Sequence, residues 1–184
     1  FSDNLLDATN NFMLHIENAE EVSGIPDDVL QTAKEIAKKD NVSGWKFTLH
    51  APSYQPIMQY ADDRELRKKM YQAYSTRASE AGVTAEIYSG GKADWDNTPL
   101  IRKILELRKE EALLLGFNSY AEVSLASKMA STPKQVLEFL TDLAVKAKPY
   151  AKNDLEKLQR FASDQIGLNN LESWDLAYVS EKLR

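Results

Sequence analysis

Residues 98–116 read TPLIRKILELRKEEALLLG. Thr98 is a favoured N-cap residue, and Pro99 follows it at the first helical position, where the missing N–H is not needed. Leucine and isoleucine fill the interior, and Gly116 stands where helices commonly end in a left-handed residue. The stretch therefore predicts an α-helix from Thr98 to Leu115.

Similar start, stop and periodicity signals predict further helices on both sides of this one. The expected elements are a helix over 3–20, a helix that begins at Pro26 and ends at Lys38–Lys39, a turn with a short helix in 51–60, a helix over 64–80 that Gly82 ends, two helices that begin at the capping boxes Ser119/Glu122 and Thr132/Gln135, and a last helix capped by Ser173. Pro149 interrupts the pattern that follows Pro133. Because an interior proline removes a backbone donor, we expect either one kinked helix or two helices that meet near Lys148.

One short strand interrupts this helical series. Trp45, Phe47 and Leu49 alternate with polar residues, which is the period of a strand. A lone strand is unstable, and the long loop expected over 83–97 could supply a partner hairpin. The predicted fold class is mainly α, an irregular multi-helix assembly with one short β element near 45–49. We expect residues 1–184 to form a single helical fragment, with a possible subdivision near the 83–97 loop.

Composition excludes several classes of protein. The chain has 184 residues, no Cys, and only 7 Gly and 6 Pro, which argues against a disulfide-stapled domain and a turn-rich β-sandwich. Its net charge of −5 gives no general attraction to nucleic acid or anionic membranes, so we expect neither as a partner. No apolar run is long enough to cross a membrane. Since the chain begins at Phe1 rather than Met and ends at Arg184 within a helical pattern, we expect it to be a fragment.

The two histidines, His15 and His50, stand apart from each other and from other candidate metal ligands. A zinc site of the His-Glu-x-x-His type needs two imidazoles on one helical face, and this sequence has no such motif. We interpret both histidines as surface or hydrogen-bonded side chains.

Neighbouring carboxylates and basic runs also favour structural roles. The carboxylate pairs are Glu20-Glu21, Asp27-Asp28, Asp62-Asp63 and Glu110-Glu111. Adjacent helical side chains diverge, so we interpret these pairs as solvated helix faces and complements of helix dipoles. The runs Arg64, Arg67, Lys68, Lys69 and Arg102, Lys103, Arg108, Lys109 alternate with glutamates and predict ion-paired exposed faces. There is no Cys nucleophile and no Gly-x-Ser-x-Gly elbow, and Gly90-Gly91 alone is a weak phosphate-loop signal.

Aromatic residues offer one binding hypothesis, because tyrosine combines a large apolar ring with a polar tip. A groove for peptides could be lined by members of the set Tyr54, Tyr60, Tyr71, Tyr74, Tyr88, Trp95, Tyr120, Tyr150 and Tyr178. We expect most of them to contribute to packing instead. Local chemistry alone therefore describes a helical domain without a visible active site.

Several strings nevertheless resemble the oligopeptidase A branch of the thimet oligopeptidase family. They are FSDNLLDAT (1–9), GWKFTL (44–49), PSYQPIM (52–58), YQAYSTRAS (71–79), WDNT (95–98), LRKE (107–110), LGFNSYAE (115–122), KMA (128–130) and WDLAY (174–178). The strings occur in the same order as in the family and cover essentially the whole chain.

This resemblance implies a zinc-dependent peptidase that cleaves short peptides in a deep channel between two largely helical halves. The family's metal motif is His-Glu-x-x-His with a downstream Glu, and neither His15 nor His50 stands in such a motif. The resemblance therefore implies an internal piece upstream of the zinc helix, with catalytic and metal-binding residues elsewhere in the parent chain. It places no catalytic, metal-binding or substrate-binding residue within residues 1–184.

Our leading hypothesis is a non-catalytic helical segment that shapes the substrate channel of a cytoplasmic zinc oligopeptidase. The parent would hydrolyse peptides with a zinc-bound water and a Glu as general base, whereas the segment alone would hold no zinc and be inactive. Its partners would be short peptides, through the parent, and the remainder of the peptidase chain. The alternative is a stand-alone helical module that binds a partner protein or peptide in a Tyr-lined groove.

Overall fold

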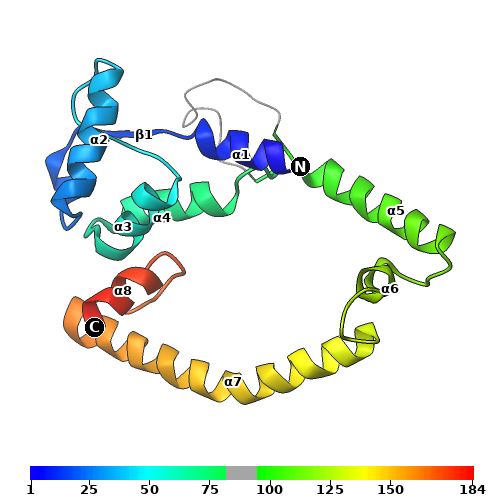
Figure 1. Ribbon diagram of the computed structural model, residues 1–184. Helices are drawn as coiled ribbons and strands as arrows, with labels where there is room; N and C mark the ends of the chain where they lie inside the picture. The colour runs from blue at the N-terminus through cyan, green and yellow to red at the C-terminus, as the bar shows by residue number, and fades with distance from the viewer. Residues whose placement is uncertain (82–94) are drawn as a thin grey trace. The chain divides into compact units, whose positions relative to one another are not determined.

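The computed structural model describes residues 1–81 and 95–184 and is mainly helical (Figure 1). Within these residues, eight α-helices accompany one two-stranded antiparallel sheet, which confirms the predicted mainly α class. The elements are α1 (Ser2–Asn10), β1 (Leu14–Ile16), the 3-10 helix η1 (Ala19–Val22), α2 (Asp27–Lys39), β2 (Trp45–Phe47), α3 (Ala51–Tyr60), α4 (Arg64–Ser75), α5 (Thr98–Leu114), α6 (Tyr120–Leu125), α7 (Pro133–Phe161), the π-helical η2 (Ala162–Ile166) and α8 (Leu176–Leu183).

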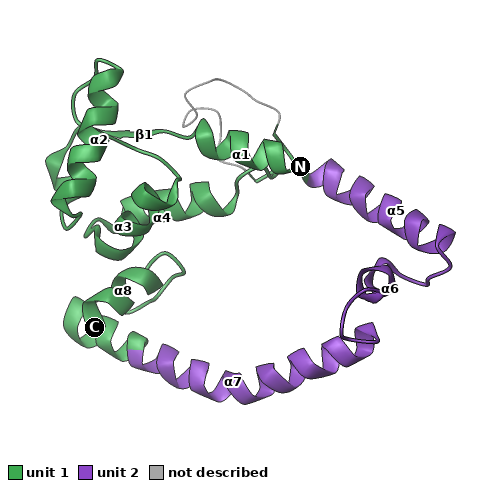
Figure 2. Cartoon of the chain, in the orientation of Figure 1, with its two compact units in different colours: residues 1–97, 158–184 green, residues 98–157 purple. Residues whose placement is uncertain are grey.

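The chain divides into two compact units, which Figure 2 colours separately. Unit 1 comprises residues 1–97 and 158–184, and unit 2 comprises residues 98–157. The sheet and the larger hydrophobic core belong to unit 1, whereas α5, α6 and most of α7 belong to unit 2.

The predicted strand exists, but its partner is a segment that the sequence pattern assigned to a helix. β2 pairs with β1 in the register Leu14↔Phe47, His15↔Lys46 and Ile16↔Trp45. The expected helix over 3–20 is therefore wrong beyond Asn10. The side-chain amide of Asn11 donates to the Asp7 carbonyl at 2.9 Å and helps to end α1. The backbone beyond this point bonds across to β2 instead of continuing the helical ladder. The hairpin expected within 83–97 falls largely on residues 82–94, which lie outside the described residues.

Gly44 makes the close approach of β1 and β2 possible. Its backbone φ is +82°, a conformation that residues with a side chain rarely adopt. A Cβ at this position would overlap the carbonyl group of Ile16 in the neighbouring segment. Glycine is thus required here for two reasons: the left-handed φ angle, and the lack of space for a Cβ next to the Ile16 carbonyl.

The larger core of unit 1 collects apolar residues from β1, η1, α2, β2, α3 and α4 and from the loops between them. It comprises Phe12, Ile16, Val22, Ile25, Ala33, Trp45, Phe47, Leu49, Ile57, Met58, Ala61, Leu66, Met70 and Ala73. The predicted helices over 26–39 and 51–60 are confirmed as α2 and α3. Their apolar faces and the inward side of β2 therefore enclose this larger core.

The helix predicted over 64–80 begins where expected but ends at Ser75. Asp63 caps its start, because its carboxylate accepts hydrogen bonds from the backbone N–H groups of Glu65 and Leu66, two and three residues later. At the other end, the Arg77 guanidinium donates to the Tyr74 carbonyl at 2.8 Å, and Ala78 takes a left-handed φ of 50°. The prediction for 76–80 is thus wrong, because side chains satisfy the last carbonyls before the expected stop at Gly82.

A buried ion cluster joins α4 to the segment that begins α8. Asp175 is fully buried, with Arg64 Nη2 at 2.7 Å from Oδ2 and Arg67 Nη2 at 2.9 Å from Oδ1. The backbone N–H of Glu172 also donates to Oδ2. Arg67 is only 2% exposed, so the prediction of an exposed, ion-paired face over 64–69 is wrong for this residue. It is confirmed for Lys68, which pairs with Glu65 on the surface.

The same carboxylate explains where the last helix begins. Ser173 was expected to cap it, but α8 starts at Leu176 with Asp175 in the cap position. That prediction is wrong because the two arginines and Glu172 fix Asp175, and with it the turn that leads into the helix.

Charge compensation also sets the acidity of Asp175. Burial alone would raise the pKa of its carboxyl group, but hydrogen bonds from Arg64 and Arg67 outweigh this effect. The net result is a pKa below the usual value for aspartate. The cluster is therefore a stabilising contact only while Asp175 carries its charge.

Unit 2 shows how completely local signals can define a helix. α5 ends in a Schellman motif, with Gly116 at φ +80° and the Phe117 N–H donating to the Ala112 carbonyl. Both capping boxes form: Ser119 Oγ accepts from the N–H of Glu122, and Thr132 Oγ1 accepts from that of Gln135. The predictions for 98–115 and for the starts of α6 and α7 are thus confirmed to within a residue.

α7 continues through Pro149 as one helix rather than two (Figure 1). Proline leaves the carbonyl four residues earlier, on Val145, without its helical donor. Val145 is 67% exposed, so water can satisfy that carbonyl at little cost. Among the described residues, no helix combines the length and the apolar composition that a membrane crossing requires.

The buried cluster yields a first prediction. Asp175→Asn should lower the free energy of unfolding by about 3 kcal/mol, because it leaves two guanidinium groups without a counter-charge, one of them buried. Urea denaturation followed by circular dichroism measures the loss. Asp154→Asn removes an exposed pair with Lys157 and should change stability by less than about 0.5 kcal/mol. Equal effects of the two substitutions would contradict the assigned role of Asp175.

The pKa of Asp175 adds a pH dependence to this prediction. Its folded-state pKa lies below the unfolded value of 3.8, so the unfolded chain takes up the proton first as pH falls. The stability that Asp175 contributes is therefore present above pH 3.8 and is lost progressively below it. Urea denaturation at neutral and acidic pH measures this effect. The difference in the free energy of unfolding between the two pH values should be smaller in Asp175→Asn than in the native chain.

A second prediction concerns Gly44. Gly44→Ala should destabilise the chain by about 3 kcal/mol or more, since the new methyl group meets the Ile16 backbone and the left-handed φ is strained as well. Gly167→Ala is the matched control, because φ is +74° there and nothing lies within 4 Å of the added Cβ. Strain alone should cost it about 1 kcal/mol. Thermal unfolding distinguishes the two, and a Gly44→Ala chain as stable as the control would refute the overlap.

Candidate functional site

The two histidines lie in positions that do not form a metal site. His15 is on β1, and its Nε2 lies 2.6 Å from the Ser43 carbonyl oxygen, so this nitrogen carries the proton and donates it. A protonated ring nitrogen cannot also bind a metal ion. His50 precedes α3 as its N-cap residue and is exposed. The interpretation of His15 as a hydrogen-bonded side chain and of His50 as a surface one is confirmed.

Zinc, which the family resemblance implies, therefore does not fit the residues present. Within residues 1–81 and 95–184, no three or more His, Cys, Asp or Glu side chains gather in a way that could hold a metal ion. We derive no catalytic step through zinc from this chain.

The predicted role at a helix start is confirmed for Asp27, Asp28 and Asp63 but is wrong for Asp62, which lies outside the helices. Asp27 and Asp28 lie in the first turn of α2, where negative charge complements the helix dipole. Asp62 and Asp63 have separate partners: Asp63 caps α4, whereas Asp62 accepts from the Tyr178 hydroxyl at 2.9 Å. Burial acts to raise the pKa of Asp62, but hydrogen bonds from Tyr178 and Ser23 lower it below its usual value. Neither pair converges on a common substrate atom.

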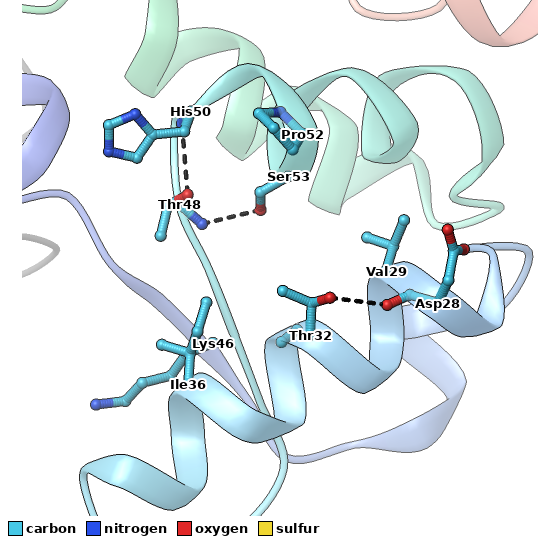
Figure 3. A pocket seen from close by; sticks show the side chains of 10 residues that line it. Asp28, Val29, Thr32, Ile36, Lys46, Thr48, His50, Pro52 and Ser53 are labelled. Atoms are coloured by element: carbon cyan, nitrogen blue, oxygen red, sulfur yellow. Dashed lines mark hydrogen bonds between the residues drawn. The ribbon is translucent and has the colours of Figure 1, made fainter.

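A pocket of about 250 Å³ lies between α2, β2 and the start of α3 (Figure 3). Its lining residues are Asp28, Val29, Thr32, Ala33, Ile36, Lys46, Thr48, His50, Pro52 and Ser53. The polar groups bond mainly to one another or to nearby backbone: Thr32 donates to the Asp28 carbonyl, and Ser53 Oγ accepts from the Thr48 N–H. Lys46 pairs with Asp40 at 2.5 Å. These contacts account for the local fold and do not define a ligand.

A second hollow, a groove of about 430 Å³, lies between α3, α4 and α8 of unit 1. It is lined by Tyr54, Gln55, Met58, Gln59, Tyr71, Ser173, Leu176 and Ala177. Aromatic and aliphatic side chains provide apolar surface, and two glutamine amides with a serine hydroxyl provide hydrogen-bonding groups. Such a lining suits an apolar peptide side chain next to peptide amides, and it offers no acid, base or metal-ligand pair for catalysis.

Aromatic stacking fixes the tyrosines of this groove. The rings of Tyr54 and Tyr74 stack with centroids 4.3 Å apart, and the Arg77 guanidinium covers Tyr74 at 3.7 Å. Burial, with smaller contributions from neighbouring tyrosines, raises the pKa of Tyr54 to about 12. Tyr54 is therefore neutral at physiological pH and can act as a hydrogen-bonding and packing group.

The hypothesis of a Tyr-lined groove is met by only part of the predicted set. Tyr54 and Tyr71 line the groove, and Tyr74 stacks on Tyr54. The others take separate positions: Tyr60 contacts Glu181, Tyr178 is buried, Tyr120 lies under Arg108, Tyr150 is exposed, Trp95 is partly buried, and Tyr88 lies outside the described residues.

Sequence reasoning missed the half of the groove that comes from the end of the chain. Ser173, Leu176 and Ala177 lie more than 100 residues after Tyr54 and Tyr71, and no local pattern links them. The spacing of apolar residues from Trp174 to Val179 is the signal that marks this segment as a packing face.

Comparison with known proteins identifies the family. A model described as Peptidase family M3 matches residues 57–184. Oligopeptidase A of Haemophilus influenzae is 47% identical over 182 residues, which are 99% of this chain and 26% of that protein. The Escherichia coli oligopeptidase A is 46% identical over the same shares, and a probable cytosolic oligopeptidase A of Arabidopsis thaliana is 40% identical over 100% of the chain and 26% of its own length.

The chain thus spans about a quarter of the length of these curated relatives. The family model covers α4 to α8 and the last part of α3, which together contain the buried Asp175 cluster and most of the groove between α3, α4 and α8. Because this match extends over well more than half of the residues, the chain belongs to peptidase family M3.

Proposed function

We propose that the chain is a non-catalytic helical segment of a zinc-dependent oligopeptidase that hydrolyses short peptides. The observation that carries this proposal is the 47% identity to an oligopeptidase A along 99% of the chain but only 26% of that relative. Residues for the chemistry can then lie in the other three quarters of such a protein. The proposed unit is a single helical fragment, residues 1–184, of that larger peptidase.

The chain's own donor set supports placing zinc elsewhere in the parent. The sequence has two histidines and no cysteine, and the next residues after His15 and His50 are Ile16 and Ala51 rather than glutamate. His15 already donates its Nε2 proton to Ser43. The ligands and the general base would therefore come from outside residues 1–184, and this segment would contribute no catalytic residue.

The contribution of this segment would be to shape the channel that admits substrates. Helices pinned together by a buried ion cluster make a stiff wall, which is the property needed to exclude folded proteins by size. The groove lined by Tyr54 and Tyr71 supplies apolar surface and amide groups that suit a peptide. We propose short peptides and the remainder of the peptidase as partners, without nucleic acid or membrane.

We also propose a cytoplasmic location. One Arabidopsis thaliana relative is a probable cytosolic oligopeptidase A, which supports this placement. Another relative from the same plant is named as chloroplastic or mitochondrial, so organelle fractionation of the source cell is the direct test.

A second candidate function is a stand-alone helical module that binds a partner protein or peptide. The groove between α3, α4 and α8 is the observation that favours it, since two tyrosines line it together. The gene distinguishes the candidates. A His-Glu-x-x-His coded beyond Arg184 supports the peptidase, and a stop codon directly after Arg184 supports the module.

The third prediction tests the peptidase proposal. The chain purified alone should retain no stoichiometric zinc and should not cleave a quenched fluorescent peptide. The parent chain should cleave the peptide, lose activity with a chelator and recover it with zinc. Elemental analysis and fluorescence provide the two measurements. A His15→Ala, His50→Ala double variant controls for adventitious zinc at the only imidazoles of this sequence.

Chelator-sensitive turnover by the chain alone would contradict the non-catalytic role. A parent that cleaves no short peptide would contradict the oligopeptidase assignment. The channel role has its own readout: a folded protein substrate should resist the parent, while short peptides cut from the same protein should be hydrolysed.

A further inference from the structure

Residues 137–157 of α7 form a long helical stretch in which every residue is exposed. At 1.5 Å per residue the stretch is roughly 30 Å long. Its large apolar side chains are open to solvent: Leu137 64%, Phe139 62%, Leu140 53%, Leu143 46%, Val145 67%, Tyr150 76% and Leu155 42%. Long helices in water normally depend on packing of an apolar face, so this exposure requires an explanation.

Most of these apolar residues share one face of the helix. Residues spaced three and four apart follow one another along it, and together they define what we call the α7 stripe: Leu137, Leu140, Leu143, Ala144, Ala147, Ala151 and Leu155. Leucine stands at both ends and alanine in the middle. Small central residues allow another helix backbone to approach closely, and the flanking leucines can pack on either side of it.

On the opposite face of α7, charged side chains pair with one another and face water. Lys134 pairs with Glu138 at 3.7 Å, Asp142 with Lys146 at 2.7 Å, and Lys152 with Glu156 at 4.0 Å. All three pairs join residues four apart on the same helix, so their charges need no outside partner. The charged face is therefore the solvent face, and the α7 stripe is the face that a partner would cover.

We propose that the α7 stripe is covered by an apolar helical segment of the same peptidase chain that lies outside residues 1–184. This inference rests on the proposed function, in which the parent is a longer M3 peptidase. The relatives are about four times as long as the chain, so ample polypeptide is available. A segment tethered in the same molecule acts at high effective concentration, which favours it over a separate molecule with the same apolar surface.

Cysteine labelling tests this proposal directly, since the chain contains no native cysteine. Leu140→Cys and Ala147→Cys place thiols on the α7 stripe, and Lys146→Cys places one on the charged face as the matched control. Each variant is made in the parent peptidase and in the 184-residue chain. Maleimide labelling rates are read by peptide mass spectrometry, so that cysteines elsewhere do not interfere.

In the 184-residue chain, all three positions should label at similar rates. In the parent, Cys at 140 and 147 should label at least about tenfold more slowly than Cys at 146, as expected for a site that reacts only on local opening. Ala147→Cys is a small change that keeps the test valid if Leu140→Cys disturbs folding.

The other outcomes separate this inference from the proposed function. Equally fast labelling of all three positions in a parent that hydrolyses peptides would overturn the inference and leave the function intact. Protection that disappears on dilution, together with a dimer in sedimentation, would assign the cover to a second copy and overturn the inference. A parent without chelator-sensitive hydrolysis would overturn the proposed function and, with it, the occupant named here.

Discussion

The carboxylate of Asp175, buried between Arg64 and Arg67, is the contact on which the arrangement of unit 1 depends. It joins residues that are 108 and 111 positions apart in sequence, and it does so where α4 meets the start of α8. A carboxylate without exposure is tolerated only because two guanidinium groups and a backbone N–H surround it. The groove with Tyr54 and Leu176 on its walls lies between α3, α4 and α8, and this contact joins α4 to the start of α8.

Local signals predicted the fold wherever the deciding partner lies within about one helical turn. The Thr98 start, the Gly116 stop and the two capping boxes appear in the structure because their hydrogen bonds span only three to five residues. The strand at 14–16 was missed because its partner, 45–47, lies about 30 residues away and overrides a helical pattern. The burial of Arg67 was missed for the same reason, since Asp175 is distant in sequence.

The candidate site was predictable to a smaller extent. Tyrosine composition suggested a groove, but only the fold selects Tyr54 and Tyr71 from the set and adds Met58 and Leu176. The hydrogen-bonded role expected for His15 is met by a carbonyl 28 residues away, that of Ser43, which no local pattern indicates. The family could be identified only from ordered strings, because the sequence contains no catalytic motif that points to it.

The two units are stabilised by different interactions: a buried apolar core in unit 1, and helix caps and ion pairs within single helices in unit 2. Unit 1 has a core of its own, built mainly from α2, α3, α4 and both strands. In residues 98–157, Ala112 is the buried residue, and caps with ion pairs four residues apart specify the helices instead. Such local terms fix where a helix begins and ends but contribute only about 0.2–0.5 kcal/mol per pair, too little to orient it. With the cover proposed for the α7 stripe, packing on its leucines would orient α7, and this segment would acquire its final form in the complete molecule.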